Sequence, residues 1–96
     1  MDFIPGDFVS YYYNDIPYHA IVKMNDFINK ECLVCTSEYS GYVRIKSDKL
    51  TLVKLSIEKK LYILGQFDDC WVKENKRLFT KILTDAKIEY NKLKIN

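Results

Sequence analysis

The sequence predicts a mainly β fold with a helical addition: a small five-stranded antiparallel barrel over residues 1–54, then a helical extension over residues 55–96. Two observations lead to this prediction. Up to residue 54, short segments rich in Tyr, Val, Ile and Thr alternate with turn residues, and several short strands at this spacing are typical of a barrel. After residue 54, apolar residues recur every three to four positions, which is the spacing of helices.

The predicted strands follow one another closely. They cover residues 7–13, 17–24, 31–37, 42–45 and 49–53. Pro5-Gly6 opens the first strand, and Asn14-Asp15, the stretch 25–30 and Ser40-Gly41 supply residue types that favour turns. These short connections predict antiparallel neighbours along the chain.

Two helices are predicted in the C-terminal part. Ile57, Leu61 and Leu64 share one helix face, and Gly65 is a plausible stop. From about residue 75, a wide apolar stripe contains Leu78, Ile82, Ala86 and Tyr90, with Phe79 and Leu83 beside it. Residues 66–72 have no clear period. A stripe this wide has to be buried, so we expect the extension to pack on the barrel as one structural unit.

Composition and charge limit the function classes. The chain has 96 residues and a net charge of +2, and its basic excess lies after residue 54. The chain has 13 Lys and only 2 Arg, which argues against base-specific recognition of nucleic acid. Arg is better suited than Lys to make two hydrogen bonds to guanine or phosphate. No apolar run is long enough to span a bilayer. The absence of a signal peptide and the odd number of cysteines predict an intracellular protein, cytoplasmic or nuclear.

The residues with potential for chemistry are few. Cys32 and Cys35 are spaced as in a zinc motif, but on a strand they point to opposite faces, and four ligands are lacking. The single histidine, His19, is expected to face outward. Asp68-Asp69 is expected to form a turn or a helix cap. No nucleophile–base pair is recognisable, so we predict no metal site, no cofactor and no enzymatic activity.

The β part carries a recognisable set of short motifs. In order, they are Gly6-Asp7-Phe8-Val9, Tyr13, Tyr18-His19-Ala20-Ile21-Val22, Glu31-Cys32-Leu33-Val34, Tyr39-Ser40-Gly41 and Leu50. Over about residues 5–53 this pattern resembles a Tudor domain, a small SH3-like barrel. The resemblance implies a binding module, which in some members holds methylated Arg or Lys in an aromatic cage, where ring faces attract the cation.

The resemblance also implies candidate site residues. Tyr13, Tyr18 and Tyr39 match cage aromatics, and Thr36 occupies the fourth ring position without being aromatic. Gly41 stands where the family has an asparagine, and Tyr11 where it has a small residue; Tyr42 and Tyr12 are the alternatives for the missing wall. Strand alternation places Tyr13 and Tyr18 at the open end of the inward-facing series. The alternative interpretation is that these tyrosines simply pack in the core.

The predicted function is therefore a non-catalytic, Tudor-like binding module that recognises a peptide or protein segment, with methylated Arg or Lys as one candidate. One alternative is a small accessory or inhibitory protein of phage or bacterial type, acting through protein–protein contacts, with a homodimer through the C-terminal helix as one arrangement. A further alternative is single-stranded nucleic-acid binding, in which bases would stack on tyrosines. The net charge of −1 over residues 1–54 argues against this alternative, because such binding uses a positively charged groove. No membrane partner is expected.

Overall fold

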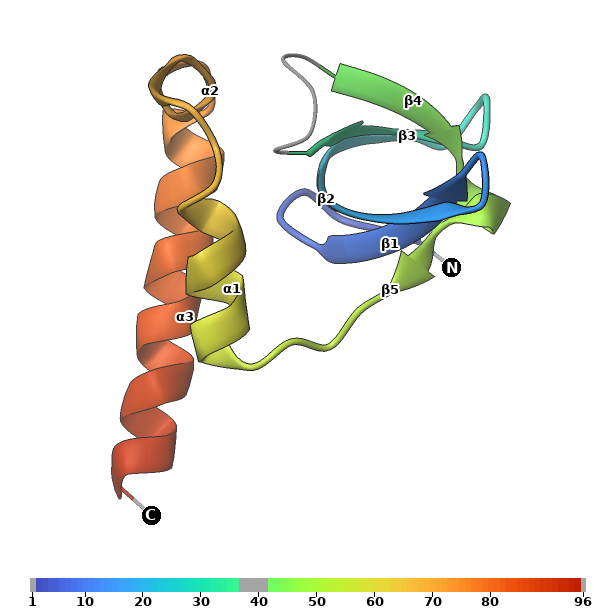
Figure 1. Ribbon diagram of the computed structural model, residues 1–96. Helices are drawn as coiled ribbons and strands as arrows, with labels where there is room; N and C mark the ends of the chain where they lie inside the picture. The colour runs from blue at the N-terminus through green and yellow to red at the C-terminus, as the bar shows by residue number, and fades with distance from the viewer. Residues whose placement is uncertain (1, 37–41, 96) are drawn as a thin grey trace. The chain divides into compact units, whose positions relative to one another are not determined.

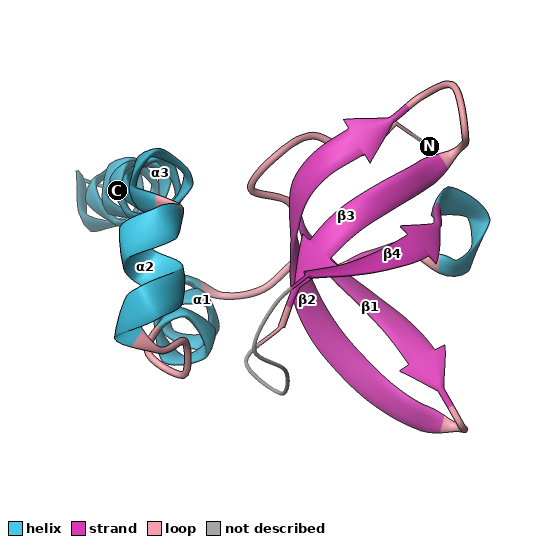
Figure 2. Ribbon diagram, turned by 90° about the horizontal axis from the view of Figure 1, so that it is seen from above, coloured by secondary structure: helices cyan, strands magenta, loops and turns pink. Residues whose placement is uncertain are grey.

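The computed structural model describes residues 2–36 and 42–95, and the chain divides into two compact units, residues 1–54 and 55–96. Within the described residues, the first unit is a five-stranded antiparallel sheet and the second consists of helices (Figures 1 and 2). This confirms the predicted combination of an antiparallel sheet and C-terminal helices. Closure of the sheet into a barrel and packing of the helices on it stay predictions.

The strands lie close to their predicted positions. They are β1 Phe8–Tyr13, β2 Ile16–Asp26, β3 Glu31–Cys35, β4 Tyr42–Lys46 and β5 Thr51–Leu52, in the sheet order β4-β3-β2-β1-β5. β5 is shorter than expected because a 3-10 helix, η1 Ser47–Lys49, takes up the start of the predicted segment, and the Leu50 N–H donates to Ser47 O at 3.2 Å.

The chain enters the sheet through a tight turn over residues 4–7. The Asp7 N–H donates to Ile4 O at 3.1 Å, and Gly6 has a φ of 98°. This is the position of a type II turn that favours glycine, with proline before it. The turn directs Phe3 into the core, where the Asn25 side-chain amide donates to Phe3 O at 2.8 Å.

β2 contains an irregularity that shapes the sheet. Its register against β3 shifts between Val22 and Met24, so that Lys23 is an extra residue. Such a bulge bends the strand and increases its twist. β2 accordingly curves strongly along its length (Figures 1 and 2).

One face of the sheet forms a buried core. It contains Phe3, Val9, Tyr11, Ala20, Val22, Cys32, Val34 and Leu50, with Tyr18, Val43 and Ile45 partly buried beside them. Strand residues of this core alternate along each strand. On the opposite face, the paired residues Phe8, Ile21 and Cys35 are buried as well. The core therefore fixes which side chains of β1 and β2 face inward.

Three helices form the second unit as far as the structure describes it: α1 Ile57–Leu64, α2 Asp69–Glu74 and α3 Lys76–Ile95. α1 starts at Ser56, whose hydroxyl accepts from the Lys59 N–H at 3.2 Å, and it ends before Gly65, as predicted. α2 lies where the sequence has no clear period. Asp68 caps it by accepting from the Trp71 N–H at 2.8 Å.

Aromatic packing joins α2 to α3. The rings of Phe67 and Trp71 stack with centroids 4.2 Å apart, and Phe79 meets Trp71 edge-on at 5.9 Å. The buried Asn75 separates the two helices and donates from its side chain to Trp71 O at 3.1 Å.

α1 lies alongside α3 (Figure 1), and Lys60 Nζ and Glu89 Oε2 form an ion pair at 3.2 Å between them. Ile82 and Ala86 of the predicted apolar stripe are buried, whereas Tyr90 is more than half exposed. Over the described residues, no helix combines the length and apolar character that crossing a membrane requires.

Candidate functional site

The turn between β1 and β2 sets the geometry of the first candidate surface. Asn14 and Asp15 have φ values of 50° and 64°, so both central residues of this two-residue turn are left-handed. Such a turn matches the twist of a hairpin, and Asn and Asp tolerate it better than most residues. It fixes the pairs Tyr13–Ile16 and Tyr11–Tyr18, which all face the same side as the core residue Val9.

Exposure rises steadily along this face of the hairpin. Tyr11 is buried at 4% exposure, and its ring stacks on that of the half-buried Tyr18 with centroids 5.6 Å apart. Tyr13 and Ile16, at the end of the hairpin, are 56% and 52% exposed. We call Tyr13, Ile16 and Tyr18 the hairpin surface. It is an apolar, aromatic surface that continues the core out to solvent.

One acidic residue lies at the end of the hairpin surface. Of the three aspartates in residues 2–22, Asp15 belongs to the turn next to Tyr13 and Ile16, whereas Asp2 and Asp7 lie toward the other end of β1. The Asp7 carboxylate accepts from the Ile4 N–H at 3.0 Å, whereas Asp15 sits exposed in the turn beside Tyr13. Aromatic faces and a nearby carboxylate both favour a cation over an anion.

The structure places Tyr42 apart from the hairpin surface. Tyr42 pairs with Cys35, Cys35 with Ile21, and Ile21 with Phe8, which lies five residues along β1 from Tyr13. That separation corresponds to about 16 Å of strand. Its neighbour Val43 packs on the core, so Tyr42 is on the other face of the sheet.

Tyr42 instead holds a cation from its own chain. Lys23 Nζ donates to the Tyr42 hydroxyl at 2.8 Å and lies 4.0 Å from the centroid of its ring. Lys23 lies on this face because it directly follows the inward-facing Val22. Alternation along β2 therefore predicts the face of Lys23, but its closeness to Tyr42 depends on the registers of β2 with β3 and of β3 with β4, which the sequence alone does not give.

Two other candidates have different outcomes. Thr36 directly follows β3 and is buried at 2% exposure, so its side chain is part of the interior and not an open wall. Tyr39 lies outside the described residues, as does Gly41. Of the five predicted binding residues, the structure thus brings Tyr13 and Tyr18 together on one surface.

The residues that suggested metal or redox chemistry lie apart. Cys32 is in the core, whereas Cys35 donates from its thiol to Ile21 O at 3.4 Å, and Cys70 is exposed in α2. His19 is exposed on β2. Across residues 2–36 and 42–95, no three His, Cys, Asp or Glu side chains gather closely enough to hold a metal ion.

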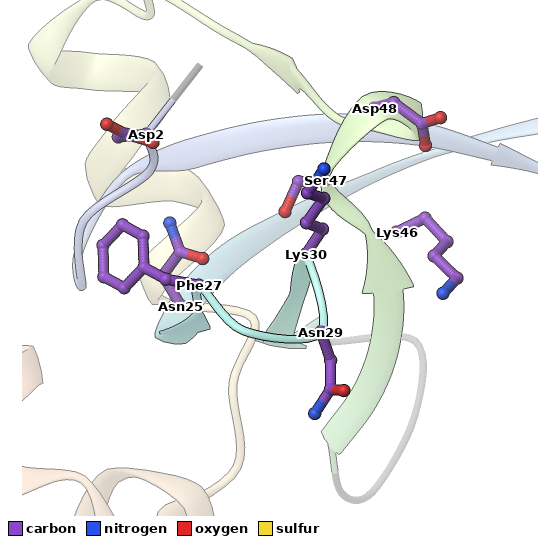
Figure 3. A pocket seen from close by; sticks show the side chains of 8 residues that line it. All are labelled: Asp2, Asn25, Phe27, Asn29, Lys30, Lys46, Ser47 and Asp48. Atoms are coloured by element: carbon purple, nitrogen blue, oxygen red, sulfur yellow. The ribbon is translucent and has the colours of Figure 1, made fainter.

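A second, polar hollow lies around the β2–β3 turn. It has a volume of about 610 Å³ and is lined by Asp2, Asn25, Phe27, Asn29, Lys30, Lys46, Ser47 and Asp48 (Figure 3). The turn is held by Asp26, whose carboxylate accepts from the backbone N–H of Ile28 and of Asn29 and from the Asn29 side chain at 2.8–3.1 Å. The bond from the Asn29 side chain is the main reason why the pKa of Asp26 lies below its usual value.

The lining of this hollow favours neither a positive nor a negative ligand. It contains two lysines and two aspartates, and Lys46 already pairs with Glu31 at 3.4 Å. The sequence indicates only a turn here, because the hollow is assembled from three segments that are distant in the chain. Of the two surfaces, the hairpin surface has the more definite ligand chemistry.

Comparison of the chain with protein-family models, with curated proteins and with solved structures found no match.

Proposed function

We propose that residues 1–54 form a non-catalytic binding module of the SH3-like, Tudor-like kind, which recognises a basic peptide segment through the hairpin surface. A lysine or arginine side chain, in its methylated form the best fit, would lie over Tyr13 and Tyr18. The observation that carries the proposal is an exposed apolar and aromatic surface, Tyr13 with Ile16 and the half-buried Tyr18, beside the exposed Asp15 of the turn.

The strand arrangement supports a barrel. β5 returns to pair with β1, so the last strand lies beside the first, and the Val53 N–H donates to Phe8 O at 2.9 Å. The bulge at Lys23 bends β2 in the way that closing a small sheet requires. A closed SH3-like barrel would present the end of the first hairpin at one rim.

The chemistry favours a methylated cation. Methylation removes ammonium or guanidinium hydrogens that water would bind, and the remaining charge is attracted to the faces of tyrosine rings. The contact of Lys23 with Tyr42 illustrates the attraction in the same sheet, with 4.0 Å between nitrogen and ring centroid. Asp15 beside Tyr13 would add attraction for a neighbouring basic residue of the peptide.

The test is an NMR titration of the ¹⁵N-labelled full chain with peptides that carry unmodified, methylated lysine or methylated arginine. We expect shifts centred on Tyr13, Ile16 and Tyr18. Tyr13→Ala should weaken binding about 5- to 30-fold, the loss of a cation–π contact worth about 1–2 kcal/mol. Tyr12→Ala is the matched control, since Tyr12 is exposed on the same strand but faces the other side.

Three results would contradict the proposal. The first is that no basic peptide changes the NMR chemical shifts of the chain. The second is equal weakening by Tyr13→Ala and Tyr12→Ala. The third is binding of a single-stranded oligonucleotide instead, with an affinity that falls steeply as salt rises. If Tyr18→Ala unfolds the sheet, the stack on Tyr11 is structural, and Tyr13→Ala alone decides.

A further inference from the structure

The helical unit contains an apolar groove between α1 and α3. Its volume is about 360 Å³, and it is lined by Ile57 and Leu61 of α1 and by Leu83, Ala86, Lys87, Tyr90 and Asn91 of α3. Leu61 and Tyr90, one from each helix, are 46% and 54% exposed. The groove is therefore open to solvent along both sides.

The shape of the groove suits a third helix. α1 and α3 lie side by side (Figure 1), and two neighbouring helices leave a furrow into which the ridge of another can pack. On α3, Leu83, Ala86, Tyr90 and Leu93 follow one another at intervals of three, four and three residues. This is the spacing by which helices pack in coiled coils, and Leu93 extends the stripe past the groove, where it is exposed.

Among the described residues, one charged side chain, that of Lys87 on α3, lines the groove. Asp85 and Glu89 are each two residues from Lys87, so they project about 160° around α3 from it, away from the groove, and Glu89 is paired with Lys60. The whole unit, residues 55–96, has nine basic and six acidic residues.

We propose that this groove binds an amphipathic helix of another protein, one whose apolar face is flanked by acidic residues. The apolar lining would take two or more large side chains at helical spacing. The charge of Lys87 would select for acidic flanks and speed association. A second copy of this chain is a poorer occupant, since it would bring its own Lys87 against this one.

The test uses two designed helical peptides that share leucines at heptad spacing and differ only in their flanks, which are glutamate in one and lysine in the other. Binding to the full chain is followed by fluorescence anisotropy at low and physiological salt. We expect the glutamate peptide to bind at least tenfold more tightly than the lysine peptide. Its affinity should fall as salt rises, because rim charges are screened.

Variants locate the binding site. Leu61→Ala should weaken the glutamate peptide about tenfold, since it removes most of one half-exposed wall. Lys87→Glu should weaken it about three- to fivefold, which is typical of an exposed charge pair. Lys92→Glu makes the same charge change five residues along, about 140° around α3 from Lys87, and should leave the affinity unchanged.

Other outcomes would overturn the proposal. Equal affinity for both peptides would show that charge does not select the partner. Equal effects of Lys87→Glu and Lys92→Glu would place binding elsewhere. A mass that doubles with concentration in light scattering and returns to the monomer in Leu61→Ala would assign the groove to a second copy. Failure of either peptide to bind, while Leu61→Ala changes NMR shifts on the sheet, would assign it to the chain's own N-terminal unit.

Discussion

The two units expose apolar side chains in the same way but place a residue of opposite charge beside them. In the sheet, the inward-facing series runs from the buried Tyr11 to the exposed Tyr13; in the helices, the stripe runs from the buried Ala86 to the half-exposed Tyr90. The first series ends beside Asp15, and the second beside Lys87. The two proposals therefore assign ligands of opposite charge to similar apolar surfaces.

The largest expected effect tests whether the units fold independently. Trp71→Ala removes the ring that packs between Phe67 and Phe79, which should cost the helical unit about 3–5 kcal/mol. Helical circular dichroism should fall, while the NMR signals of Val9 and Ala20 keep their positions. Simultaneous loss of both units would instead show a shared core, as the predicted packing of helix on sheet requires.

A milder replacement at the same position is the control. Trp71→Phe keeps an aromatic ring and removes an indole N–H that is buried and has no acceptor among the described residues. An unpaired buried donor contributes unfavourably, so this variant should lose much less stability than Trp71→Ala. Equal losses would mean that the N–H has a partner that the packing of this unit depends on.

A smaller effect is expected at the hairpin turn. Asn14→Ala puts a residue with a Cβ and no compensating side-chain bond at a φ of 50°, which should cost about 1 kcal/mol in the free energy of unfolding. Asn14→Gly should be close to neutral. Urea unfolding measures both, and an alanine variant as stable as the glycine variant would show that the turn can change type without moving Tyr13.

The polar turn between β2 and β3 should respond to pH through Asp26. The pKa of Asp26 is lowered in the folded chain from an ordinary 3.8, chiefly by hydrogen bonds from Asn29. A lowered carboxyl pKa adds stability that is fully present above the unfolded value and is lost as the pH falls through the folded one. NMR titration of Asp26 should give a midpoint below 3.8, and Asn29→Ala should raise it; a midpoint at or above 3.8 contradicts the turn geometry.

The smallest effect is expected at the end of α1. Gly65 has a φ of −69°, and an added Cβ would meet only Leu61 O and Tyr62 O at 3.5 Å, an ordinary contact. Gly65→Ala should therefore stabilise the helical unit by about 0.4–1 kcal/mol through the unfolded chain. Thermal unfolding shows whether the variant is more or less stable than the natural chain. A loss of stability would mean that the residue after α1 needs the conformational freedom of glycine.

Much of the fold could be predicted from local pattern. The alternation Val9, Tyr11, Tyr13 gave β1 and its inward face, and the spacing of Ile82 and Ala86 gave α3, because each periodic signal spans enough residues to be distinctive. The sequence does not predict α2, because its six residues make fewer than two turns of helix. Its N-cap residue, Asp68, is of a type that is equally common in turns. The predicted strand over residues 49–53 is longer than β5, because its first residue, Lys49, belongs to η1.

The site was harder to predict than the fold. Tyr13 and Tyr18 come together through one short turn, so local sequence was sufficient to pair them. The place of Tyr42 depends on the registers of two further strand pairs, which no local pattern encodes. The groove between α1 and α3 likewise depends on how two helices align, which the spacing of Ile57 and Leu61 leaves open.

The bulge at Lys23 also determines how this chain could change its length in evolution. After Val22, the extra residue restores Asn25 to the inner side, opposite Cys32, from where it binds Phe3 O. Deleting Lys23 would leave Met24 outward and Asn25 inward, because plain alternation from the inward-facing Val22 gives the same faces, and it would remove the bend of the bulge. Unlike most positions of a strand, this one should therefore tolerate the loss of one residue without exchanging the faces of the strand.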